Sequence, residues 1–252
     1  MQGIVIEGGR PLSGEVVIGG AKNAILPIMA ASLLVPGTVR IRNVPRLQDV
    51  TTFLALLRSM GVRGEFEDHT LVLDASRLDS VEAPYDHVKK MRASIYVLGP
   101  LLARFGEARV SLPGGCAWGP RPVNLHQDAM QALGAQLSLD HGYIVASAAK
   151  LRGARVAFDI SSVGATGNAM MAAVLADGTT VIENAACEPE MSALAGFLSA
   201  MGARIEGAGT KTITIHGVSR LEPPQDFCNI PDRIEAGTFL AAAAITRGDV
   251  TL

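Results

Sequence analysis

The sequence predicts an α/β (α+β) protein built from a repeated βαβαββ unit, and three observations lead to this fold class. The 252 residues are 48% hydrophobic and 18% charged, with 27 glycines and only 4% aromatic residues, which is typical of globular α/β proteins. Segments rich in Ala, Leu and Met with helical periodicity alternate with short β-branched runs. This pattern recurs with a period of 70 residues. Its three complete copies favour a closed, threefold arrangement.

The first helix of each copy is the clearest part of the repeat. Positions 22, 92, 162 and 232 are spaced 70 residues apart, and each opens a helix-like segment. A glycine near 37, 106, 178 or 248 ends the segment, and a β-branched run such as 38–41 or 179–182 follows. These signals predict a helix followed by a strand.

The second half of each copy predicts another amphipathic helix and two short strands. The helices are expected over residues 49–60, 125–133 and 190–201, and Gly61, Gly134 and Gly202 close them. Together with the strand before each first helix, the unit becomes βαβαββ. The fourth copy stops within its first returning strand, so we expect the natural protein to be longer.

Several classes of protein are disfavoured by composition. A net charge of -2 gives no broad electrostatic footprint for nucleic acid. The chain shows neither a leader pattern nor an apolar run of about 18 residues, which predicts a cytoplasmic protein with no membrane partner. The three cysteines form no C-x-x-C spacing, so neither a disulfide framework nor a zinc site is expected.

The starts of the repeated helices predict an anion-binding site. Helix N-termini carry unpaired N–H groups and a partial positive charge, and related copies would bring these ends to one face. Lys22 and Arg92 would add full charges there, although either residue alone would more ordinarily be a solvated surface residue. Ser161, Ser162 and Gly164 would form an N-cap and turn, or donate hydrogen bonds to a diphosphate.

The second copy carries four more residues between its helix-ending glycines than the first or third. They fall in residues 113–122, a segment of three glycines and three prolines that suits a mobile lid. Cys116 precedes Arg121 by five positions, which would favour thiolate formation. The thiol form could then donate a proton, and the thiolate form could attack covalently. We expect Cys187 and Cys228, in contrast, to be inert buried residues.

Seven motifs together resemble the enolpyruvyl transferase family over the whole chain. They are residues 20–24 (GAKNA), 91–94 (MRAS), 112–116 (LPGGC), 121–126 (RPVNLH), 162–166 (SVGAT), 183–186 (ENAA) and 231–235 (PDRIE). The resemblance implies an inside-out α/β barrel with two domains, each of three βαβαββ units around buried helices. It implies a complete first domain over 22–230, and a partial second domain made of 1–21 and 231–252.

The resemblance also implies the roles of individual residues. Cys116, Lys22 and Arg121 would be catalytic, with Cys116 as the proton donor and the residue that fosfomycin alkylates. The residues implied to bind substrates are Lys22, Asn23, Arg92, Arg121, Pro122, Val123, Asn124, Leu125, Ser161, Ser162, Val163 and Gly164. Asn124 replaces a frequent Asp, and Ile160 replaces a Lys of some members. The family's catalytic Asp would lie beyond residue 252.

The reaction implied by the resemblance transfers enolpyruvate from phosphoenolpyruvate to the 3-hydroxyl of UDP-N-acetylglucosamine, the first committed step of peptidoglycan synthesis. It requires neither a metal nor an organic cofactor. Two alternatives remain: a catalytically incomplete nucleotide-sugar-binding fragment, and a shikimate-pathway enolpyruvyl transferase, which carries Lys-Ser where this chain has Lys22-Asn23. We expect the 252 residues alone to be inactive and to need the C-terminal half of the same enzyme as a partner.

Overall fold

The computed structural model describes residues 3–88, 91–112 and 123–252, and three four-stranded sheets form the outer walls of its main body. Each sheet has one parallel pair and two antiparallel pairs. The strands of the first sheet are, in spatial order, β13 (Phe227–Cys228), β2 (Thr38–Arg42), β4 (Thr70–Asp74) and β3 (Arg63–Glu67). Those of the second sheet are β5 (Glu82–Ala83), β6 (Glu107–Ser111), β8 (Tyr143–Ser147) and β7 (Gln136–Asp140). Those of the third sheet are β11 (Arg204–Glu206), β12 (Thr212–His216), β10 (Thr179–Glu183) and β9 (Arg155–Ala157).

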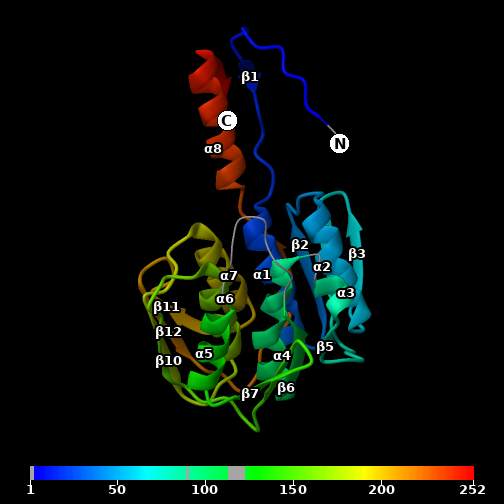
Figure 1. Ribbon diagram of the computed structural model, residues 1–252, viewed down its shortest axis with the longest axis vertical. Coiled ribbons are helices and arrows are strands. Elements are labelled where there is room, and N and C mark those ends of the chain that lie inside the picture. Colours follow the sequence, from blue (N-terminus) through cyan, green and yellow to red (C-terminus); the bar gives the residue numbers. More distant parts are fainter. Residues whose placement is uncertain (1–2, 89–90, 113–122) are drawn as a thin grey trace.

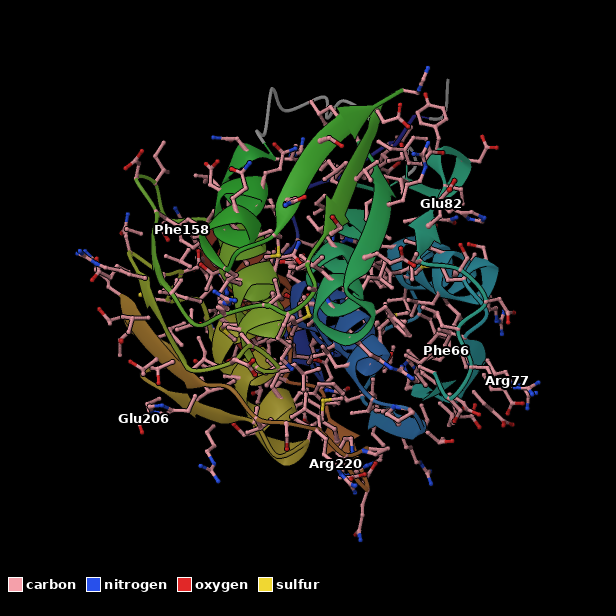
Figure 2. The ribbon with its side chains drawn as sticks, turned by 90° about the horizontal axis from the view of Figure 1, so that it is seen from below. Phe66, Arg77, Glu82, Phe158, Glu206 and Arg220 are labelled. Atoms are coloured by element: carbon pink, nitrogen blue, oxygen red, sulfur yellow. The ribbon has the colours of Figure 1, made fainter. Side chains whose placement is uncertain are left out.

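The first helices of the repeats lie inside these sheets. They are α1 (Lys22–Ala31), the 3-10 helix η2 (Arg92–Val97) continuing into α4 (Leu98–Phe105), and α6 (Val163–Ala173). Every residue of α6 from Ala165 onward is buried, as is every residue of α1 from Ala24 onward. A helix that is apolar on all sides is stable only in a core. In the end-on view, α1 (blue) lies in the middle, while labelled Phe66 and Glu206 lie on opposite outer sides (Figure 2).

The second helices are amphipathic and pack at the edges of this core. They are α2 (Gln48–Ser59), α5 (Asn124–Ala132) and α7 (Pro189–Ala200), each within one residue of its predicted start. Two short helical turns, η1 (Ser32–Leu34) and α3 (Tyr85–Val88), complete the main body. The left-handed φ of 75° at Gly106, which ends α4, explains why a glycine follows that helix.

The first repeat departs from the predicted strand order. We predicted that each copy's leading strand precedes its own first helix, and β5 and β9 follow this rule. However, β1 (Ser13–Glu15) pairs with β14 (Asp249–Thr251), and β2 instead takes β13 as its parallel partner. The physical reason is a crossing of two backbone segments, in which Ala21 N–H donates to Ile230 O at 2.7 Å and Asp232 N–H to Gly19 O at 2.8 Å.

Beyond this crossing, β1, α8 (Arg233–Thr246) and β14 project from the main body (Figure 1). No residue of α8 is buried, although its sequence is rich in Ala, Ile and Leu. Ile245 and Leu240 are 84% and 61% exposed. Within the described ranges, none of the helices combines the length and apolar character that a bilayer crossing requires.

Candidate anion-binding site

A cavity of about 440 Å³ lies where the first helices of successive repeats begin. Its lining comes from α1, η2, α6 and α8, with further residues from α5 and from the start of α7. The lining residues are Asn23, Leu26, Arg92, Ala93, Ile95, Tyr96, Val123, His126, Ser162, Val163, Gly164, Glu188, Glu190 and Arg233. The structure thus brings together residues from all four repeat positions.

The start of α6 presents unpaired donors to this cavity. Ser162 is its N-cap, and the Ser162 hydroxyl accepts from Ala165 N–H at 3.3 Å. The N-cap interpretation of Ser162 is therefore confirmed. The N–H groups of Val163 and Gly164 belong to the first turn, where a helix offers no acceptor of its own. The positive end of the α6 dipole accordingly faces the cavity.

Lys22 and Asn23 open α1 but point to different surroundings. Asn23 lines the cavity, whereas the Lys22 ammonium lies 3.1 Å from Asp49 Oδ2 on α2, with both side chains 40% exposed. An exposed pair of this kind contributes about 0–1 kcal/mol, so an incoming anion can compete for the ammonium. The sequence did not identify Asp49 as its partner.

The cavity also contains a histidine to which we had assigned no role. His126 is 6% exposed, and its Nδ1 lies 2.9 Å from Nδ2 of the fully buried Asn168. Burial, with the nearby charge of Arg92, lowers the pKa of His126 to about 4. The imidazole is therefore neutral near pH 7.

Two carboxylates of the α7 region border the same space. Glu190 is 3% exposed and accepts from Arg233 Nε on α8 at 3.0 and 3.3 Å. This pair joins the main body to the projecting helix. Burial, with Glu190 and Glu188, raises the pKa of the Tyr96 phenol above its ordinary range. Tyr96 thus remains a neutral phenol.

The other predicted site residues that the structure describes are not among those that line this cavity. Ser161 lines a neighbouring depression of about 400 Å³ together with Lys211. Asn124 begins α5, and Leu125 packs against the core. Cys116, Arg121 and Pro122 lie outside the described residues, as does the whole predicted lid segment.

The expectation that Cys187 and Cys228 are buried was wrong, because both are exposed. Cys187 lies in the connection between β10 and α7, and Cys228 ends the two-residue strand β13. Each thiol lies 3.7 Å from a backbone carbonyl oxygen. In the part of the chain that the structure describes, no group of three His, Cys, Asp or Glu side chains is placed to hold a metal ion.

Comparison with known proteins relates the chain to one family over nearly its whole length. The family model of EPSP synthase (3-phosphoshikimate 1-carboxyvinyltransferase) matches residues 6–252. Proteins named UDP-N-acetylglucosamine 1-carboxyvinyltransferase from Chlorobium limicola and Chlorobium chlorochromatii are 57% and 58% identical over 255 residues. The alignments cover 100% of this chain, and the chain spans 60% of the length of these relatives.

Solved structures show the same fold. The enolpyruvyl transferase NikO from Streptomyces tendae has a TM-score of 0.82 and 29% identity, over 93% of this chain and 56% of that one. EPSP synthase from Acinetobacter baumannii has a TM-score of 0.73 and 17% identity, over 94% of this chain and 54% of that one. The predicted fold class, the α/β fold of the enolpyruvyl transferase type, is confirmed.

Proposed function

The chain belongs to the EPSP synthase family of enolpyruvyl transferases, and from this premise we propose that it serves a UDP-N-acetylglucosamine 1-carboxyvinyltransferase reaction. The donor is phosphoenolpyruvate, and the acceptor is the 3-hydroxyl of UDP-N-acetylglucosamine. The observation that carries the proposal is the cavity in which Arg92, Asn23 and the first turn of α6 meet. Both substrates are polyanions, and cations with helix N-termini are suited to bind them.

The choice of acceptor is supported by the relatives that share 57% and 58% identity, whose names specify UDP-N-acetylglucosamine. The shikimate-pathway alternative is less well supported, because the matching EPSP synthase structure is only 17% identical. The pair Lys22-Asn23 also differs from the Lys-Ser pair of that enzyme class. A nucleotide-sugar acceptor therefore accounts for the sequence better than shikimate 3-phosphate does.

In the proposed reaction, Lys22, Asn23 and Arg121 bind phosphoenolpyruvate and Cys116 donates a proton to its C3. Protonation makes C2 cation-like, and the sugar 3-hydroxyl oxygen bonds to C2 as it loses its proton. Loss of a proton from C3 then restores the double bond while the C2–O bond to phosphate breaks, which leaves an enol ether. The cationic residues stabilise phosphate and carboxylate charge throughout, a role for which an always-charged guanidinium is suited.

The nucleotide sugar occupies the other part of the proposed site. Arg92 contacts the nucleotide sugar, and Ser161, Ser162, Val163 and Gly164 donate to its diphosphate. Arg121, Pro122, Val123, Asn124 and Leu125 hold the uridine. Support for the diphosphate position comes from the unpaired N–H groups at the start of α6. The proposed site requires neither a metal nor an organic cofactor.

We also propose the pathway and cellular location of this reaction, and the domains and partner that it requires. It is the first committed step of peptidoglycan synthesis, located in the cytoplasm, and fosfomycin inhibits it. Residues 22–230 form one domain, and residues 1–21 with 231–252 contribute to a second. The exposed apolar side chains of α8 support a further partner, the C-terminal half of the same enzyme, which completes that second domain and is required for turnover.

Alkylation by fosfomycin tests the proposal on this chain. We expect the adduct on Cys116, and we expect added UDP-N-acetylglucosamine to accelerate its formation. Cys187 and Cys228 are exposed and serve as internal controls within the same molecule. Peptide mapping by mass spectrometry measures each site, and an adduct found mainly on either control cysteine would contradict the proposed role of Cys116.

A further inference from the structure

The amide of Asn168 has a fixed orientation in the core. Its Oδ1 accepts from the backbone N–H of Gly99 at 2.7 Å, and its Nδ2 donates to the backbone carbonyl of Ile95 at 2.8 Å. If the amide were rotated by 180°, Nδ2 would face the N–H donor of Gly99 and Oδ1 would face the carbonyl oxygen of Ile95, so neither hydrogen bond could form. The atom that lies 2.9 Å from His126 Nδ1 is therefore an N–H donor.

This orientation determines the tautomer of His126. Since Nδ1 accepts from Asn168, the single proton of the neutral imidazole resides on Nε2. Burial together with Arg92 keeps the ring neutral by lowering its pKa to about 4. His126 consequently presents an N–H donor, and no lone pair, through its Nε2 edge.

The Nε2 edge lies against the first turn of α6. A Cβ atom on Gly164 would meet His126 Nε2 and Cε1 at 3.0 Å, so the imidazole and this glycine are in close contact. His126 is more than nine-tenths buried, yet it lines the cavity. Within the described residues, the ring is hydrogen-bonded by Asn168, which occupies Nδ1.

We propose that His126 is a nucleotide-sugar-binding residue whose Nε2–H donates a hydrogen bond to the diphosphate at the start of α6, and that Asn168 is the positioning residue that sets its tautomer. A phosphate oxygen only accepts hydrogen bonds, so the opposite tautomer would turn a lone pair toward it. A neutral donor adds a contact beside Arg92 without placing two positive charges together. This inference rests on the proposed function.

Binding of UDP-N-acetylglucosamine to the 252-residue chain, measured by calorimetry, tests the role of His126. We expect His126→Leu to weaken binding about tenfold or more, as loss of a hydrogen bond to a charged group does. His126→Gln, which keeps an N–H donor, should retain most of the affinity. Uridine, which lacks the diphosphate, should bind His126→Leu and the unsubstituted chain equally. His216→Leu, on the outer strand β12, is the matched control and should bind as the unsubstituted chain does.

The tautomer has a separate readout that requires no ligand. Long-range proton–nitrogen NMR of the imidazoles should show His126 Nε2 protonated and Nδ1 unprotonated near pH 7. A proton on Nδ1, or equal affinity of His126→Leu and the unsubstituted chain for UDP-N-acetylglucosamine, would overturn the inference and leave the proposed function intact. Failure of the unsubstituted chain to bind this nucleotide sugar would overturn both.

Discussion

Replacement of His126 by leucine should remove a specific part of the pH dependence of folding. The pKa of His126 falls from an ordinary 6.5 to about 4 in the folded chain, because burial and Arg92 disfavour the imidazolium. Between these pH values the unfolded chain binds a proton that the folded chain does not. The free energy of unfolding therefore decreases as the pH falls from about 6.5 to about 4, and this contribution levels off below that.

The size of the effect follows from the same two pKa values. One pKa unit corresponds to about 1.4 kcal/mol, so full protonation of the unfolded chain lowers the free energy of unfolding by about 3 kcal/mol. Between about pH 7 and about pH 4.5 the expected decrease is about 2 kcal/mol. In His126→Leu this decrease should be absent. Other titrating groups contribute equally to the free energy of unfolding of both proteins, so their contributions cancel when one pH profile is subtracted from the other.

Urea denaturation at a series of pH values measures this difference. The leucine variant leaves an Asn168 N–H without an acceptor, which lowers its stability by about 1–3 kcal/mol at every pH. The comparison therefore uses the slopes of the two profiles and not their absolute values. Parallel profiles between about pH 7 and about pH 4.5 would show that His126 is not held neutral by its surroundings, and the reasoning would fail.

Two further substitutions test contacts around the cavity. Gly164→Ala should be less stable than Gly196→Ala by about 1–3 kcal/mol. Both variants gain the helix propensity of alanine, but only the methyl group at position 164 would overlap the His126 imidazole, at 3.0 Å. Equal melting profiles of the two variants would contradict the contact between Gly164 and His126. Arg233→Met should destabilise the chain by about 3 kcal/mol or more, because it leaves the buried Glu190 carboxylate without its partner, whereas Glu190→Gln removes that charge and should be milder. Denaturation of both variants near pH 7 measures the two losses of unfolding free energy. A smaller loss in Arg233→Met than in Glu190→Gln would refute this reasoning.

The repeat made much of the fold predictable from sequence. Its helix starts at 22, 92, 162 and 232 agree with the first residues of α1 and η2 and with the N-caps of α6 and α8. Helix ends are predictable because caps and glycines act locally. The exchange of β1 and β13 could not be predicted, because strand partners are chosen by contacts between distant segments: Ser13 pairs with Asp249, 236 residues away, and Ile41 pairs with Phe227, 186 residues away.

The interactions within the site were less predictable. His126 and Asn168 are separated by 42 residues, and no periodicity connects them. One signal was nevertheless present, since Asn168 is a polar residue within the Ala- and Met-rich helix α6. A buried amide must have hydrogen-bond partners. Cys187 and Cys228 were misplaced because an isolated small residue outside a long periodic segment carries no signal of burial.

Residue type at the four repeat positions distinguishes helix starts that otherwise look equivalent. Asp232 caps α8 by accepting from Ile234 and Glu235 N–H, and its other oxygen accepts from Lys22 N–H of α1 at 3.2 Å. One carboxylate thus offsets the positive ends of both α1 and α8. Position 162 holds a neutral serine, so the cap itself adds no negative charge at the positive end of α6. The diphosphate position that we propose at α6 is therefore electrostatically more favourable than one at either helix start that Asp232 occupies.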